Sequence, residues 1–177
     1  DDDDPGTTLF IVPADAPGVR TVEDPLFTHN YGDGHPTIAF ENVRVGAEAV
    51  LGGVGNADDL QRSWFVEERL GVAIRCVGAM SRLIEEATAW AMSRVQGGQR
   101  IYDYQGISFP LADSAADAAA ARLLVFEVAR LADAGADVKV VHAKASLAKL
   151  FAAEAAFRCA DRAVQTFGGR GYMRSNV

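Results

Sequence analysis

A glycine-rich turn near residue 170 is the part of the sequence best suited to hold an anionic group. The segment Gln165-Thr166-Phe167-Gly168-Gly169-Arg170-Gly171-Tyr172 follows a long helical pattern. Its three glycines let the backbone turn sharply and come close to a bulky ligand. Main-chain amides exposed in such a turn can hold a pyrophosphate without a charged side chain. A plain helix C-cap explains the same glycines, so the motif alone leaves both interpretations open.

A second group that could do chemistry lies at the start of the first helical pattern, at Glu67-Glu68-Arg69. A carboxylate there can act as a general base, and burial that raises its pKa would help it do so. The two glutamates are adjacent and project roughly 100° apart on a helix, so they do not form a paired-carboxylate site. The alternative for Glu68 is an exposed carboxylate in an early helical turn, where the helix dipole favours negative charge. For Arg69 the alternative is an ion pair with a neighbouring carboxylate.

The cysteines and histidines are assigned no chemical role. Cys76 and Cys159 lie inside helical patterns with no ligand partner nearby in the sequence, which is typical of small core residues in a reducing compartment. His29 and His35 flank a turn without a third metal ligand at usable spacing, so no metal site is predicted. For His142, within a long helical pattern, a surface or interhelical contact is the expected role.

Composition and charge narrow the class of protein. Of the 177 residues, 49% are hydrophobic, which supports a packed core. The formal net charge of −7 offers no basic stripe for nucleic acid. No apolar run reaches a membrane-spanning length. The acidic start, Asp1 to Asp4, has no signal-peptide pattern, and arginine strongly outnumbers lysine. We therefore expect a cytoplasmic protein from a GC-rich bacterium.

The N-terminal third has a sequence pattern typical of short strands separated by turns. Residues 8–12, 37–40 and 43–45 are apolar and β-branched, and proline–glycine and glycine-rich segments lie between them. They predict part of an antiparallel sheet. Because the first residues would be a poor start for a domain, we expect residues 1–57 to be the end of a larger β domain.

From about residue 58 the pattern becomes helical. Helices are predicted over about 59–94, over 104–134, and from 137 onward, with Gly97-Gly98 and Gly135 closing the first two. Each has about 30 residues, or roughly 45 Å at 1.5 Å per residue. Residues 58–177 are therefore expected to form a partial up-down bundle of three long helices, so that the chain is mainly α.

One apolar face is predicted for each helix. The first face comprises Leu70, Ile74, Val77, Ser81, Ile84, Thr88 and Ala91. The second comprises Leu111, Ala115, Ala118, Val125, Ala129 and Ala132. The third is a stripe of small residues that lets helix axes approach closely: Ala145, Ala148, Ala152, Ala155, Cys159 and Ala163. On the third helix Leu150, Phe157 and Val164 offer a second contact face.

Five elements in order carry a resemblance to a known family. They are Asn42-Val43-Arg44-Val45, Glu68-Arg69-Leu70, the helix end at Arg94, Tyr104-Gln105, and Gln165-Thr166-Phe167-Gly168-Gly169. Their order and spacing closely resemble the acyl-CoA dehydrogenases. The resemblance implies that residues 1–57 are the second half of a middle β domain. It also implies that residues 58–177 belong to a C-terminal helical bundle and end just after a flavin-binding motif.

The resemblance also implies roles for single residues. Glu68 matches the catalytic base of the isovaleryl- and long-chain-type members, whereas other members place the base in a segment that would lie beyond Val177. An acyl-CoA substrate site is implied at Val66, Glu67, Glu68 and Arg69. FAD binding is implied at Arg94, Gln96, Tyr104, Gln105, Gln165, Thr166, Phe167, Gly168 and Gly169. The sequence departs from the family where relatives have Phe-Gly after the arginine, because Gly97-Gly98 stands there.

The implied function is part of an FAD-dependent acyl-CoA dehydrogenase. Such an enzyme desaturates an acyl-CoA between its α and β carbons and passes electrons to an electron-transfer flavoprotein. The family also implies a homodimer or homotetramer in which some of these residues reach the flavin of a neighbouring subunit. An acyl-CoA oxidase or flavin monooxygenase of the same fold is one alternative, and a non-catalytic oligomerisation bundle is the other. We expect the isolated chain to be inactive.

Overall fold

The computed structural model describes residues 6–27 and 34–176. By its internal contacts the chain divides into two compact units, Asp1–Gln61 and Arg62–Val177, which are described separately below. The expectation for His29 lies outside the described residues.

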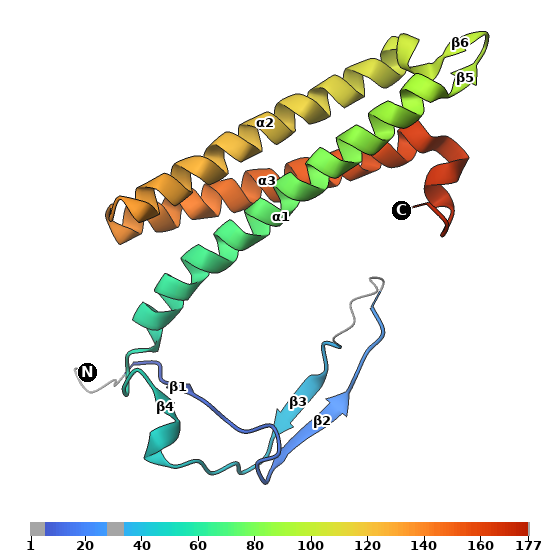
Figure 1. Cartoon of the computed structure of the whole chain (residues 1–177). Helices are drawn as coiled ribbons and strands as arrows, with labels where there is room; N and C mark the ends of the chain where they lie inside the picture. The colour runs from blue at the N-terminus through green and yellow to red at the C-terminus, as the bar shows by residue number, and fades with distance from the viewer. Residues whose placement is uncertain (1–5, 28–33, 177) are drawn as a thin grey trace. The chain divides into compact units, whose positions relative to one another are not determined.

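Short antiparallel pairs make up the first unit. Strand β1 (Leu9–Phe10) pairs with β4 (Val50–Leu51), and β2 (Val19–Glu23) pairs with β3 (Thr37–Phe40), with the 3-10 helix η1 (Ala47–Ala49) preceding β4 (Figure 1). The strand predicted over 8–12 is thus only two residues long. The strand predicted over 43–45 was wrong, because these residues pair with no neighbour. The strand β2 was not predicted.

The second unit is the predicted bundle. Helix α1 (Ala57–Ser93), helix α2 (Gln105–Asp133) and helix α3 (Val138–Phe167) run up, down and up (Figure 1). This architecture confirms the predicted mainly α fold. A hairpin of β5 (Val95–Gln96) and β6 (Gln99–Arg100), followed by the 3-10 helix η2 (Ile101–Asp103), joins α1 to α2. After α3 comes a second 3-10 helix, η3 (Gly168–Tyr172).

The glycines act at the turns, although not all as predicted. Helix α1 ends at Ser93, and Gly97-Gly98 form the tip of the β5–β6 hairpin rather than the helix stop. Gly97 has φ 65° and Gly98 has φ 89°, the left-handed region that glycine enters without strain. Gly135, with φ 66°, follows α2 as predicted.

Small residues on α3 form the centre of the core. All six members of the predicted stripe, from Ala145 to Ala163, are buried, and they let α2 and α3 pack with their backbones close together. The predicted face of α1 was partly wrong. Ile74 and Ser81 are exposed, while their neighbours Ala73 and Met80 are buried.

The predicted face of α2 also needs correction. Leu111 and Val125 are buried as predicted, but Ala115 and Ala132 are exposed. The other buried residues of α2, which were not predicted, are Ser114, Ala121 and Val128. Alanine occurs all around α2, so the composition gives no unique apolar face and the partners decide which side is covered.

A polar contact joins α2 to α3 inside the bundle. The Ser114 hydroxyl is buried and donates to the carbonyl of Pro110 at 2.9 Å, and Arg162 donates to Ser114 at 3.3 Å and to Asp117 at 3.4 Å.

Nearby, Cys159 is a buried free thiol, as predicted, and desolvation raises its pKa, which keeps it protonated and unreactive.

The described residues contain neither a metal-binding cluster nor a membrane-spanning helix. Within residues 6–27 and 34–176 there is no cluster of three or more histidine, cysteine or acidic side chains that could hold a metal ion. No helix in that part of the chain has the length and apolar character needed to cross a membrane.

Candidate functional site

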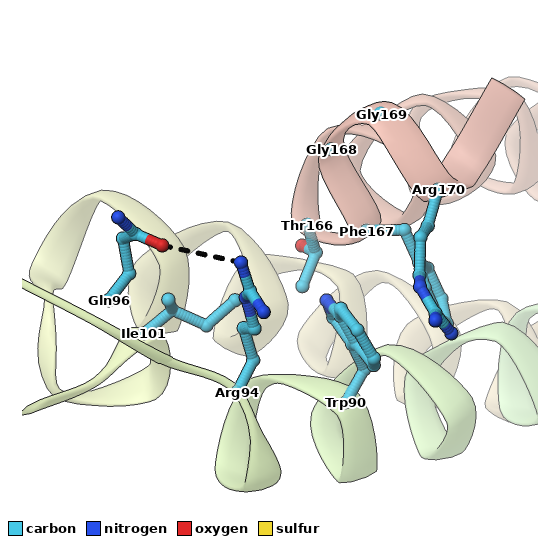
Figure 2. Close-up of a pocket in the computed structure, with 9 residues that line it drawn as sticks. All are labelled: Trp90, Arg94, Gln96, Ile101, Thr166, Phe167, Gly168, Gly169 and Arg170. Atoms are coloured by element: carbon cyan, nitrogen blue, oxygen red, sulfur yellow. Dashed lines mark hydrogen bonds between the residues drawn. The ribbon is translucent and has the colours of Figure 1, made fainter.

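A hollow of about 330 Å³ lies where the C-terminal end of α1 meets the end of α3. Helix α1, the β5–β6 hairpin, η2 and the glycine-rich turn all contribute to its wall (Figure 2). The lining residues are Trp90, Arg94, Gln96, Ile101, Thr166, Phe167, Gly168, Gly169 and Arg170. The structure therefore brings together six of the nine residues predicted to bind a cofactor.

The glycine-rich turn both ends a helix and lines the hollow. Gly168 follows α3 with φ 61°, and its N–H bonds the carbonyls of Val164 and Gln165. A Cβ on Gly171 would lie 2.7 Å from the carbonyl oxygen of Val164, so the chain can fold back there only with glycine. The C-cap and the cofactor interpretations thus describe one structure and do not exclude each other.

An aromatic stack holds this turn against α1. The Trp90 and Phe167 rings are stacked with centroids 5.7 Å apart and planes at 20°. The guanidinium carbon of Arg170 lies 5.2 Å from the centroid of the Trp90 ring, within cation–π distance. Trp90, Ile101 and Arg170 were not predicted as site residues. One signal was present for Trp90, because it lies four residues before Arg94 and therefore on the same helix face.

The hollow is electropositive although the protein is acidic. Arg94 and Arg170 line it, and none of the nine lining residues is acidic. Arg94 donates to the amide oxygen of Gln96 at 3.3 Å, a neutral partner that leaves the arginine charge uncompensated. Two guanidinium groups beside a glycine backbone suit an anion such as a phosphate.

The other three predicted cofactor residues do not line the hollow. The Tyr104 hydroxyl donates to the carbonyl of Gln96 at 3.0 Å, so Tyr104 holds the hairpin that carries a lining residue. Gln105 begins α2, and Gln165 is exposed near the end of α3.

The predicted substrate residues lie near the start of α1. Val66 is half-buried against the core, whereas Glu67 and Glu68 are exposed. The Glu68 carboxylate makes no hydrogen bond or ion pair within residues 6–27 and 34–176. Its side chain is therefore available to a ligand.

Arg69 contacts a histidine rather than a carboxylate. Its Nη1 lies 2.6 Å from Nε2 of His142 on α3, and its guanidinium carbon lies 5.2 Å from the centroid of the Phe65 ring. Because arginine only donates, Nε2 of His142 is the acceptor in this contact. His142 thus makes the interhelical contact predicted for it.

The two groups of predicted residues are far apart on one helix. Arg94 directly follows α1 and lies 26 positions after Glu68 (94 − 68), which corresponds to about 39 Å at 1.5 Å per residue. The structure therefore does not bring the predicted base and the hollow together within one chain.

Comparisons with known proteins define the class to which this fold and site belong. Residues 53–177 match the family model described as acyl-CoA dehydrogenase, C-terminal domain. An acyl-CoA dehydrogenase of Bacillus subtilis is 36% identical over 169 residues, covering 96% of this chain and 44% of the relative. The CarC subunit of the caffeyl-CoA reductase-Etf complex of Acetobacterium woodii is 34% identical over 169 residues, covering 96% of this chain and 44% of the relative.

A solved structure agrees with these sequence relatives. The butyryl-CoA dehydrogenase of Megasphaera elsdenii superposes with a TM-score of 0.86 at 31% identity, covering 96% of this chain and 43% of that one. The chain belongs to the acyl-CoA dehydrogenase family, a family of FAD-dependent oxidoreductases. It spans less than half the length of the relatives that it matches.

Proposed function

We propose that this chain is part of an FAD-dependent acyl-CoA dehydrogenase that desaturates an acyl-CoA thioester between its α and β carbons. The observation that carries the proposal is the electropositive hollow, which gathers six residues of the family's flavin-binding pattern in one place. Within this proposal, residues 1–57 are the end of the middle β domain and residues 58–177 are the helical bundle domain.

The residues of the hollow fit one part of a flavin dinucleotide. Arg94 offers a fork of donors to phosphate oxygens, and Gly168 and Gly169 let a ligand approach the backbone. A volume of about 330 Å³ is at the lower limit for ligand pockets, so it suits a nucleotide fragment rather than the whole cofactor. Bound FAD supplies the acceptor for the β hydrogen and its electron pair.

Glu68 is the proposed base on this chain. It is exposed and unpaired within the described residues, so it can take the α proton of a bound thioester onto its carboxylate. Arg69, fixed by His142, borders the same stretch of α1 and is proposed to orient the substrate. A base beyond Val177 is the alternative within the same enzyme class.

The distance between Glu68 and the hollow favours a site shared between subunits. A separation of about 39 Å along α1 is too long for both groups to serve one flavin within a single chain. We therefore propose that the hollow of one subunit completes the flavin site of its neighbour, so that cofactor binding and oligomerisation are linked.

The electron acceptor separates the two enzyme candidates. The relative from Acetobacterium woodii is named as a subunit of a complex with Etf, which supports an electron-transfer flavoprotein as partner. An oxidase or monooxygenase of the same fold would pass the electrons to oxygen instead. Oxygen consumption compared with reduction of a dye acceptor distinguishes the two.

The test of the proposed function uses the longer protein that carries this chain. We expect it to be yellow, and we expect an acyl-CoA to bleach its flavin absorbance under anaerobic conditions in a stopped-flow instrument. A protein that contains flavin but is not bleached by acyl-CoA thioesters of any chain length would contradict the proposed reaction. One that binds no flavin would favour the oligomerisation bundle.

For residues 1–177 alone we expect a colourless protein without acyl-CoA dehydrogenase activity. The hollow of this chain has room for only part of the cofactor. Flavin absorbance of the purified chain checks this expectation. Stoichiometric flavin would show that residues 1–177 contain a complete flavin site and that its placement here is wrong.

A further inference from the structure

We propose that Arg170 is a second anion-binding residue of the hollow and that, with Arg94, it binds the phosphates of the nucleotide. The proposal rests on the proposed function for the identity of the whole cofactor. The anion-binding role rests on the hollow itself. Arg170 is the variable residue inside the Gly-Gly-x-Gly turn, and the family pattern given above assigns it no role.

The first support is the position of the side chain. Arg94 and Arg170 line the same hollow and lie on opposite sides of the Trp90 ring in Figure 2. The guanidinium group of Arg170 is held 5.2 Å from the indole centroid, and the indole is itself stacked on Phe167. A planar cation that packs on a ring keeps its edge donors available for a ligand, and stacking reduces the entropy lost when a ligand binds.

The second support is the lack of a competing carboxylate. Four other arginines of the bundle have an acidic partner, namely Arg82, Arg100, Arg158 and Arg162. Arg69, Arg75 and Arg130 contact a histidine or a backbone carbonyl. Neither Arg94 nor Arg170 has an acidic partner within residues 6–27 and 34–176. In a chain with a net charge of −7, two such cations at one hollow give a local field that attracts anions.

A neighbouring hollow provides a contrast. It shares Trp90 and Phe167 with the first but is lined by Glu86, Ser93 and Asn176 and by no arginine. The aromatic pair thus separates a basic hollow from one that contains a carboxylate. An anion is expected to enter only the basic one.

The test uses this chain with ADP and inorganic pyrophosphate as probes, in a Trp64→Phe background so that Trp90 is the single tryptophan. Each probe should change the Trp90 emission, and higher salt should weaken binding because the contact is ionic. Adenosine, which has no phosphate, should bind at least tenfold more weakly than ADP. Equal affinity for adenosine and ADP, or no binding of either phosphate probe, would overturn the proposal.

Three variants separate charge from packing. Arg170→Met keeps an apolar chain over the indole and removes the guanidinium, and it should raise the Kd for ADP by about tenfold. The Kd of Arg170→Lys for ADP should lie between those of Arg170→Met and the wild type, because a point charge replaces the fork of donors. Arg174→Ala is the matched control, because it also removes one arginine charge. Arg174 is exposed, lies four residues after Arg170 and does not line the hollow.

The outcomes keep this proposal distinct from the proposed function. An Arg170→Met variant that binds ADP as tightly as the wild type would show that Arg170 only packs on Trp90, and the proposal would be wrong. An equal loss in Arg174→Ala would point to general charge and would also overturn it. Loss in Arg170→Met alone supports it even if the longer protein fails to oxidise acyl-CoA, a failure that would count only against the proposed reaction.

Discussion

At the residue scale, Tyr104 lies beside Gly97, the position at which the sequence departs from the family pattern. The Tyr104 hydroxyl lies 2.6 Å from where a Cβ on Gly97 would be, and it donates to the carbonyl of Gln96. A side chain at position 97 and the Tyr104 hydrogen bond therefore compete for the same space.

This competition predicts a measurable coupling. Gly97→Ala should lower the free energy of unfolding by about 2–3 kcal/mol. Left-handed backbone strain accounts for ~1–2 kcal/mol of this loss, and the displaced Tyr104 hydrogen bond accounts for ~1 kcal/mol. Gly98→Ala is the control, because its φ is also positive but nothing lies within 4 Å, so only the strain should appear. In a Tyr104→Phe background, Gly97→Ala and Gly98→Ala should lower the free energy of unfolding by the same amount. Urea unfolding of the four combinations measures the coupling, and an interaction energy near zero would contradict it.

Glu68 gives the second prediction at this scale, for the longer protein that carries this chain. Glu68→Gln keeps size and hydrogen bonding but removes the proton acceptor, so flavin reduction should slow by at least ~10²-fold if Glu68 is the base. Substrate binding should change little. Anaerobic bleaching of the flavin by an acyl-CoA isolates this step. A loss of about tenfold or less would mean that the base lies elsewhere and that Glu68 affects only the polarity of the pocket.

Only part of the site could be predicted from single residues. Arg94, Gln96 and the turn at Gly168 belong to a family pattern, so spacing along the chain was enough to select them. Arg170 has no place in that pattern, and its nearness to Trp90 depends on how α1 and α3 pack. The alternative considered for Arg69 was an ion pair with a neighbouring carboxylate, but its contact is His142. That residue lies 73 positions away on another helix, so spacing along the chain could not reveal it.

At the element scale, the start of α3 depends on one side chain. Asp137 is its N-cap residue, and its carboxylate accepts from the backbone N–H of Lys139 at 2.8 Å. Asp137→Ala should therefore destabilise the chain by about 1 kcal/mol. Asp133→Ala, in the last turn of α2, is the control and should cost less, because an acidic group there faces the negative end of a helix dipole. Equal effects in denaturant unfolding would argue against the cap.

The elements themselves were predictable to different degrees. Long helices with glycine turns leave a strong periodic signal, and the face of α3 could be assigned because one stripe holds only small residues. The face of α1 could not, since Ala73 and Ile74 both suit an apolar position and the packing partners choose between them. Strand β2 contains Arg20 and Glu23 and is largely exposed, so it lacks the alternation that identifies a half-buried strand.

At the scale of the whole molecule, the bundle exposes a second apolar face. On α3, opposite the buried alanine stripe, Leu147, Leu150 and Phe157 follow each other at helical spacing, and Phe157 is 77% exposed. Leu123 of α2 is 70% exposed. Large apolar side chains at regular helical spacing mark a surface that packs against another helix.

We therefore predict that the chain self-associates as a dimer or tetramer, consistent with a flavin site shared between subunits. Light scattering at micromolar concentration should give at least twice the mass of 18.8 kDa. Phe157→Glu should weaken association by at least tenfold, because it places a charge in an apolar contact that excludes water. Ala14→Glu adds the same charge at an exposed turn of the first unit and should leave the mass unchanged. A wild-type chain that stays monomeric would contradict the shared flavin site. If the chain associates and Phe157→Glu does not weaken the association, the contact lies on a different face of the bundle.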